Sequence, residues 1–381
     1  MNQNTTTPGG SAAPKKQRQS NIELLRIITM VMIVAHHFSV HGDFNFPINT
    51  ISVNRLWIQF IQIGGKIGVD VFVLISGYFL ITSTSIKWNR VIKIWLQIFT
   101  YSVLIYVVLV SLGIQPFGIK DLIKCLFPVT FSQWWFASAY FVLYLFSPYI
   151  NRALKAFDQR TYLSLLGLMT FCWCIIPTAF YETWQCNDLL WFIYLYLLAG
   201  YIRLYGIRTA LKGSTYILIS CGLILLTFLS AVFFDFVGLK LPFVGMMATF
   251  FYEMHQLPIL LISVTMFLGF LKIDIGCRPA INAISATTFG VYLIHDNAYM
   301  RDLLWKTIFK NATFADTIKL IPYSLVVVFL VFIVCSLIEL IRINVFEVQY
   351  MKLVDRLTAP KENTTKKTVL LDRLLNTQKG E

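Results

Sequence analysis

Long apolar segments separated by short polar ones make up most of this chain. Each apolar segment is close to the ~20 residues that a tilted α-helix needs to cross the hydrocarbon core of a bilayer. The fold expected from this pattern is an all-α, polytopic integral membrane bundle of about ten transmembrane helices. The predicted spans lie near residues 21–40, 60–82, 91–112, 134–150, 161–181, 188–205, 214–234, 249–271, 284–305 and 319–342.

The amino-acid composition supports a membrane protein. Of the 381 residues, 57% are hydrophobic and 13% are charged, whereas soluble domains carry about 25% charged residues. Lys and Arg outnumber Asp and Glu by 32 to 19, which in a soluble protein would suggest nucleic-acid binding. Here the basic residues lie in the tails and short loops, where the positive-inside rule explains them. We therefore predict contact with membrane lipid and no nucleic-acid partner.

The distribution of basic residues also predicts the orientation of the chain. Both ends are strongly basic, so both termini are expected in the cytoplasm, as in a multi-pass protein of the plasma membrane with an even number of spans. We expect residues 1–20 to form a disordered cytoplasmic tail and residues 346–381 to form a basic cytoplasmic tail. Residues 21–345 are the expected transmembrane domain.

The first span carries four ionisable side chains, those of Glu23, Arg26, His36 and His37. Burying such groups in hydrocarbon costs several kcal/mol, so intramembrane ionisable residues usually serve a function. Arg26 and His37 are eleven residues apart, which at about 100° per residue places them on one helix face, about 16 Å apart along the axis. This predicts a path from a cation near one surface to a base deep in the bundle. The alternatives are an Arg26 that reaches lipid phosphate and a His37 that serves packing or lies at the surface. His36 points about 100° away from His37. It is expected either to support neighbouring side chains or to face the surface.

The second span contains an acidic residue, Asp70, that needs a partner inside a membrane. A cation or histidine of the first span is the natural candidate, so Asp70 is expected to orient His37. Gly64 and Gly68 have the spacing that allows a neighbouring helix to pack closely. Gly77 is expected to leave room for a ligand chain.

Two further sets of residues carry possible chemistry. Arg90 and Lys93 lie three residues apart on one helix face and suit a phosphate clamp, although they also fit the ordinary positive-inside pattern. His295 is expected at a depth similar to that of His37, either as a functional or as a packing residue. The pair Cys172 and Cys174 has no matching Cys or His cluster, so we predict no metal site.

Taken in order, these segments resemble the membrane-bound acyltransferase 3 family. In its first helix, an Arg or Lys is followed after ten intervening residues by a catalytic His, and the match here falls on Arg26 and His37. The segment Arg90–Lys93 resembles the family's Arg-x-x-Arg motif, with Lys in place of the second Arg. The remaining similarity lies in residues 68–72, 76–80, 134–148 and 288–295.

The resemblance implies ten helices and transfer of an acyl group, usually acetyl, from cytoplasmic acyl-CoA to a hydroxyl of an extracytoplasmic or lipid-linked glycan. The acyl-CoA is then a co-substrate, and no metal is implied. Some relatives carry a fused extracytoplasmic hydrolase-like domain. Since this sequence has none, the resemblance implies either direct transfer or a separate extracytoplasmic partner protein.

Together these features predict a catalytic group and a donor-binding group. His37 is expected to act as a general base or to accept the acyl group itself. The catalytic group is predicted to be His37, Arg26, Asp70 and His295, and the CoA-binding group to be Arg90, Lys93 and Glu23.

The sequence leaves two other classes of function open. Intramembrane His, Asp and Arg also mark proton-coupled transporters and flippases, although the sequence shows no inverted repeat. A non-catalytic scaffold or sensor would not explain ionisable groups at such depth.

Overall fold

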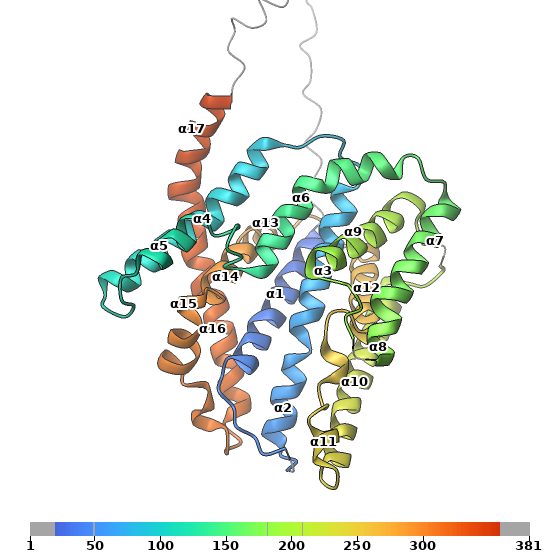
Figure 1. The fold of residues 1–381 in the computed structure, drawn as a ribbon, viewed down its shortest axis with the longest axis vertical. Helices are drawn as coiled ribbons and strands as arrows, with labels where there is room; N and C mark the ends of the chain where they lie inside the picture. Colours follow the sequence, from blue (N-terminus) through green and yellow to red (C-terminus); the bar gives the residue numbers. More distant parts are fainter. Residues whose placement is uncertain (1–19, 49, 181, 208, 359–381) are drawn as a thin grey trace, which may run out of the picture.

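The computed structural model describes residues 20–48, 50–180, 182–207 and 209–358, and these ranges are helical with no β-strand. Within them, eight helices are long and apolar enough to cross a membrane. They confirm an all-α polytopic membrane bundle (Figure 1). The eight segments are Ser20–Val40, Val53–Leu80, Trp88–Ser111, Gln159–Phe180, Asp188–Tyr205, Gly213–Gly238, Pro242–Lys272 and Leu320–Arg356.

Individual helices subdivide these segments. The first half of the chain contains α1 (Ser20–Val40), α2 (Val53–Gln62), α3 (Gly64–Leu80), α4 (Trp88–Ser111), α5 (Ile119–Leu126), α6 (Trp135–Leu154), α7 (Gln159–Thr170) and α8 (Ile176–Phe180). The second half contains α9 (Asp188–Tyr205), α10 (Gly213–Gly238), α11 (Pro242–Gly245), α12 (Leu257–Lys272), α13 (Pro279–Ser285), α14 (Thr288–His295), α15 (Ala298–Asp302), α16 (Leu320–Ile341) and α17 (Val348–Thr358). A π-helical stretch, Arg342–Glu347, joins the last two.

Two of the predicted spans have no counterpart among the eight membrane-length helices. For one of the two, the prediction of a continuous helix is wrong. The predicted span 134–150 corresponds to α6, a continuous helix of 20 residues. The predicted span 284–305 is not continuous, because it divides into α13, α14 and α15. The break between α14 and α15 follows from Asn297. Its side chain accepts a hydrogen bond from the backbone N–H of Tyr299 and so starts a new helix. The break leaves Asp296 and Asn297 between two helix ends, where their side chains can serve a site.

Helix α1 lies at the centre of the bundle, where it packs against α2, α3, α13, α14 and α16. The glycines of α3 make this close contact possible, as predicted. A Cβ atom at Gly64 would lie 2.8 Å from Met32 Cβ, and one at Gly68 would lie 2.7 Å from Ile33 Cγ1. Both distances are too short for carbon atoms, so only glycine allows α1 to approach α3 this closely.

The prediction that Gly77 leaves room for a ligand chain is wrong. A Cβ atom at Gly77 would lie 2.9 Å from the Cα and carbonyl oxygen of Tyr196 on α9. The missing side chain therefore serves close packing of α3 on α9.

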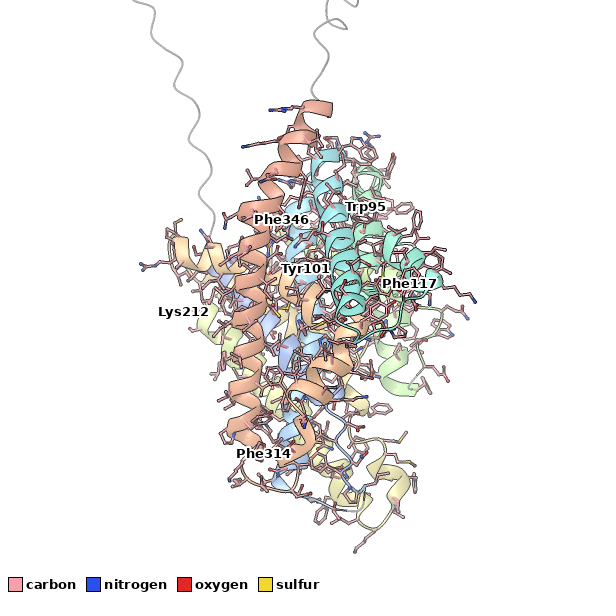
Figure 2. All side chains as sticks on the ribbon, turned by 90° about the vertical axis from the view of Figure 1, so that its left-hand side faces the viewer. Trp95, Tyr101, Phe117, Lys212, Phe314 and Phe346 are labelled. Carbon is pink, nitrogen blue, oxygen red and sulfur yellow. The ribbon has the colours of Figure 1, made fainter. Side chains whose placement is uncertain are left out.

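The last helices form one long rod along the side of the molecule (Figure 2). The segment Leu320–Arg356 has 37 residues, which at 1.5 Å per residue is about 56 Å, almost twice the ~30 Å hydrocarbon core. Residues 346–358 of the predicted tail thus continue a helix, and Asn89 of α4 donates a hydrogen bond to Asp355 there (2.9 Å). The predicted tail residues 1–19 and 359–381 lie outside the described part of the chain.

The two described ends of the chain lie at the same end of the bundle. In Figure 1, α1 begins in the upper part and runs downward, whereas α16 and α17 run upward. We refer to this upper end as the terminal side and to the opposite end as the loop side.

Candidate active site

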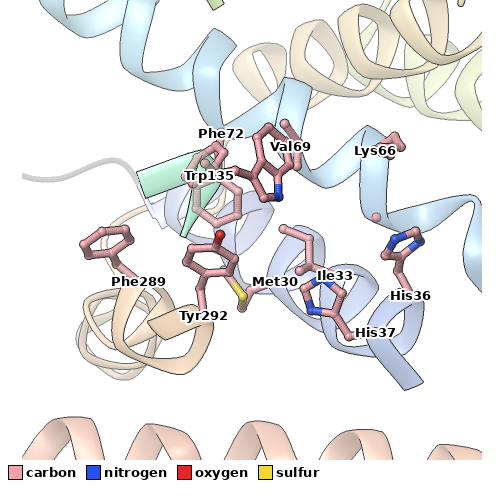
Figure 3. Close-up of a pocket in the computed structure, with 12 residues that line it drawn as sticks. Met30, Ile33, His36, His37, Lys66, Val69, Phe72, Trp135, Phe289 and Tyr292 are labelled. Carbon is pink, nitrogen blue, oxygen red and sulfur yellow. The ribbon is translucent and has the colours of Figure 1, made fainter. Parts of the chain in front are cut away.

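Two cavities follow one face of α1. The terminal-side cavity has a volume of about 300 Å³ and contacts α1 at Glu23 and Arg26. The loop-side cavity, drawn in Figure 3, has a volume of about 80 Å³ and contacts α1 mainly at Met30, Ile33 and His37. These five positions recur every three or four residues, the repeat of one helix face. The structure thus confirms that Arg26 and His37 share a face, and it places a cavity at each.

Three phenylalanines line both cavities and separate them. They are Phe72 of α3, Phe136 of α6 and Phe289 of α14. The rings of Phe72 and Phe136 meet edge to face, with centroids 6.4 Å apart. We call these three residues the aromatic partition. The rings of Phe72 and Phe136 belong to side chains, whose χ angles can change while the backbone stays in place.

His37 and His295 are linked by a hydrogen bond that fixes their tautomers. His295 Nδ1 lies 2.6 Å from the carbonyl oxygen of Val291, which can only accept, so Nδ1 carries the proton. In neutral His295, Nε2 is then an acceptor, and His37 Nδ1, 2.8 Å away, donates to it. Neutral His37 therefore holds its free lone pair on Nε2. This nitrogen is the basic atom of the pair.

An acidic residue faces that lone pair. Asp296 Oδ1 lies 3.7 Å from His37 Nε2, and the carboxylate is almost fully buried. Arg301 Nε donates to the same oxygen at 2.7 Å, and His41 Nε2 lies 3.8 Å from it. A carboxylate at this distance stabilises the imidazolium that forms when His37 Nε2 takes a proton.

Local packing positions the short helix α14 that carries His295. A Cβ atom at Gly290 would lie 2.3 Å from the carboxyl carbon of Glu339, so this position requires glycine for α14 to rest on α16. Glu339 is held in place by Arg342, through bonds of 2.7 and 2.8 Å, and by Gln97 at 2.8 Å. The buried ion pair is fully hydrogen-bonded, which is what makes its burial tolerable.

The expectation that Asp70 orients His37 is wrong. Asp70 is fully buried, and its Oδ1 accepts a hydrogen bond of 3.0 Å from Trp191 Nε1 on α9. In the described ranges, no hydrogen bond or ion pair joins Asp70 to His37. The side chain points toward the α9 side of α3, whereas α1 presents His37 elsewhere. Asp296 takes the place predicted for Asp70.

The predicted donor-binding residues lie in or near the terminal-side cavity. Glu23 pairs with Arg26 (3.3 Å) and accepts a hydrogen bond of 2.5 Å from Ser285. Lys93 lines the same cavity and forms an ion pair with Glu347. Arg90 is exposed, one turn away on α4. The structure thus brings Glu23, Arg26 and Lys93 together, with Arg90 outside the cavity lining.

The loop-side cavity contains polar groups to which the sequence analysis gave no role. Lys66 pairs with Glu253 (3.4 Å) and lies 5.7 Å from the ring centre of Trp135. Tyr292 is buried, and its hydroxyl makes no hydrogen bond with any described residue. Figure 3 shows this hydroxyl pointing into the space between the lining side chains. His36 also lines the cavity, while its Nδ1 lies 2.7 Å from the carbonyl oxygen of Gln62, a supporting contact.

The sequence analysis named neither Asp296, which faces His37, nor His41, which lies beside Asp296 and outside the His37–His295 pair. The spacing of His37 and His41, four residues apart, was a usable signal because such residues share one side of a helix. Asp296 had no such signal, since only the broken helix after His295 brings its carboxylate to α1.

Comparison with known proteins gives one match. The model of the acyltransferase 3 family, described as an acyltransferase domain, matches residues 19–340. Neither the curated proteins nor the solved structures contain a significant match to this chain. The matched residues include both cavities and the whole His37–His295 pair.

Proposed function

This chain belongs to the acyltransferase 3 family and is a membrane acyltransferase, and we propose that it transfers an acyl group, most simply acetyl, from acyl-CoA to a hydroxyl of an extracytoplasmic or lipid-linked glycan. The observation that carries the proposal is the free Nε2 lone pair of His37, held in a cavity next to a buried carboxylate. In this scheme the chain lies in the plasma membrane with its terminal side in the cytoplasm.

The donor enters from the terminal side. Arg26, Lys93 and the exposed Arg90 supply positive charge for the phosphates of CoA, since Arg and Lys suit phosphoryl oxygens. The pantetheine arm fits the terminal-side cavity and passes the aromatic partition. Its thioester then reaches the loop-side cavity and His37. The existing pair of Lys93 with Glu347 opens when a phosphate takes the place of the carboxylate.

The acceptor reaches the same cavity from the loop side. Trp135 offers an aromatic face, while Lys66 and Glu253 offer a cation and a carboxylate. Aromatic faces combined with charged hydrogen-bonding groups suit a saccharide, whose rings have apolar faces and hydroxyl edges. This arrangement supports a glycan acceptor.

The reaction follows from the tautomer of His37. The acceptor hydroxyl gives its proton to His37 Nε2, and the oxygen attacks the thioester carbonyl to form a tetrahedral intermediate. Asp296 stabilises the imidazolium, and the Tyr292 hydroxyl is placed to donate to the developing oxyanion. When the C–S bond breaks, the thiolate takes the proton from His37, which yields CoA and the ester.

Acyl transfer by the purified chain tests the proposal against a transporter. The full chain in liposomes is given acyl-CoA with an isotope label in the acyl group, together with candidate saccharides, and the products are read by mass spectrometry. We expect labelled ester and free CoA in equal amounts. Uptake of solute without acyl-CoA consumption would contradict the proposal. Acyl-CoA consumption that needs an added extracytoplasmic protein would indicate a partner for the final transfer.

Replacing Arg90 by alanine is expected to weaken donor binding. Losing one charge-assisted hydrogen bond costs about 1.5–3 kcal/mol, so KM for acyl-CoA should rise about tenfold or more, with kcat little changed. Steady-state kinetics with varied acyl-CoA measures this. The matched control is Arg160→Ala, an exposed arginine at the start of α7 outside both cavities. A fall in kcat at unchanged KM would contradict the assignment of Arg90 to the donor.

Replacing Phe72 by alanine is expected to widen the aromatic partition and to relax the choice of acyl group. One methylene in a hydrophobic pocket is worth about 1–3 kcal/mol, so the ratio of kcat/KM for butyryl-CoA to that for acetyl-CoA should rise about tenfold. Phe79→Ala, at a half-exposed position on the same helix, is the control and should leave this ratio unchanged. An equal change in both variants would exclude a role of the partition in acyl selection.

A further inference from the structure

We propose that His37, His41 and Asp296 form a binding site for a zinc-like divalent cation, and that the bound cation stops acyl transfer by occupying the base. Each of the three residues offers one ligand atom, and these atoms lie within 4.8 Å of one another. The side chain of His41 is 27% exposed and that of His37 is 12% exposed, so a cation can reach the site.

The separations between the ligand atoms suit a tetrahedral centre. With bonds of about 2.0–2.1 Å, neighbouring ligands of tetrahedral zinc lie about 3.3 Å apart. Here His37 Nε2 lies 3.7 Å and His41 Nε2 lies 3.8 Å from Asp296 Oδ1. These two separations exceed the tetrahedral spacing by about 0.4 to 0.5 Å, and all three ligand atoms lie within 4.8 Å of one another. His41 follows the last residue of α1, and its backbone N–H donates to the carbonyl oxygen of His37 (3.1 Å), so the two histidines keep the four-residue spacing of a recurring zinc-binding pair.

The surrounding hydrogen bonds prepare the ligand atoms for a metal. A metal-bound histidine needs a neutral ring whose other nitrogen donates a hydrogen bond, and His37 Nδ1 already donates to His295 Nε2. The carboxylate of Asp296 is oriented by Arg301, as ligand carboxylates usually are by a further group. Its Oδ2 is buried and has no hydrogen-bond partner among the described residues.

The chemistry of these ligands selects the kind of cation. Two imidazole nitrogens favour zinc and similar transition metals, whereas magnesium and calcium prefer sites made of oxygen. Three protein ligands leave a fourth position for water. We expect binding to be weaker than in a four-ligand structural site, because Arg301 adds positive charge beside the carboxylate.

The inhibitory part of this inference rests on the proposed function. The lone pair of His37 Nε2 is needed to accept the proton of the acceptor hydroxyl, and the same lone pair binds the cation. Both cannot happen at once, so occupancy of the site should abolish proton transfer. The site would make the enzyme sensitive to zinc present on the loop side of the membrane.

Direct binding and inhibition are measured in parallel on the full chain, purified without a histidine tag. Isothermal titration of the chelator-treated protein with zinc is expected to show one saturable site. His41→Gln should weaken this binding at least about tenfold, the cost of disturbing a ligand shell. Acyl transfer by the unmodified chain should be inhibited by zinc and restored by a chelator, while magnesium has no effect. His41→Gln should keep its basal activity and need at least tenfold more zinc for half inhibition.

Each outcome decides a separate part of the inference. Saturable binding that is equally strong in His41→Gln, or no saturable binding at all, would overturn the site. Stimulation of acyl transfer by zinc would overturn the inhibitory role. Binding that depends on His41 in a protein without any acyl transfer would support the site and count against the proposed function, so the two failures can be told apart.

Discussion

Replacing His37 by alanine is expected to lower kcat for acyl transfer by about 10²–10⁴-fold, the usual contribution of a general base. The structure gives the reason: Nε2 is the basic atom of the His37–His295 pair, and it lies in the loop-side cavity next to Asp296. KM for acyl-CoA should change little, because Arg26 lies about three helical turns away along α1 and the other two donor-binding cations lie on α4. Rates of ester formation with purified protein, at saturating acyl-CoA, measure the effect.

The matched control for this prediction is His41→Gln, at the residue that directly follows α1. His41 lies outside the hydrogen-bonded chain from Val291 through His295 to His37, so its replacement should leave the rate of acyl transfer nearly unchanged. Comparable activity of the His37→Ala variant and the unmodified chain would refute the proposed mechanism. Acid quench during turnover also separates general-base catalysis from a covalent route. An acyl group found on His37 by mass spectrometry would show that the reaction follows the covalent route.

Replacing His295 by leucine is expected to lower kcat by about 10²-fold, because the tautomer of His37 is then no longer fixed. Loss of the group that orients a catalytic histidine costs up to about 10⁴-fold in hydrolases, and we expect less here since Asp296 and His37 remain. Without His295 Nε2, the proton of His37 can sit on either nitrogen, and the form with a protonated Nε2 cannot act as a base.

Glutamine at position 295 provides the conservative test. Its side-chain oxygen can accept from His37 Nδ1, so His295→Gln should recover a large part of the rate that His295→Leu loses. Thermal unfolding of both variants shows whether the fold is retained, since His295 is fully buried. Equal loss of kcat in the two variants, with unfolding temperatures like that of the unmodified chain, would show that His295 does not act through the tautomer of His37.

The sequence predicted the face of α1 correctly because helical periodicity is a local property. Residues eleven positions apart share a side of any regular helix, and the structure adds only that cavities lie at Arg26 and at His37. The glycines of α3 were equally readable, since a small residue every fourth position allows close packing whatever the partner is. The failure at Gly77 shows the limit: the sequence indicates that something approaches closely, but not whether it is a ligand or a helix.

The partner of His37 required the tertiary structure. Asp70 and Asp296 are both acidic residues in apolar segments, and Asp70 is the natural choice from the sequence because the second span follows the first. In the fold, the carboxylate of Asp70 faces Trp191, 121 positions along the chain, while a helix break brings Asp296 to α1. The rotation of α3 about its axis and the break at Asn297 decide between the two carboxylates, and neither is encoded in a short stretch of sequence.

By itself, the sequence determined that this chain is a helical membrane protein, that it resembles the acyltransferase 3 family, and that one helix carries a cation and a base on the same face. These properties follow from composition, helical period and local motifs, each of which depends on residues close together in the chain. The tertiary structure alone decided that His295 and Asp296 lie beside His37, that three phenylalanines line both cavities, and that His41 approaches the carboxylate of Asp296. Such contacts depend on how helices far apart in the sequence are rotated and broken against one another, and packing of the whole bundle fixes those rotations.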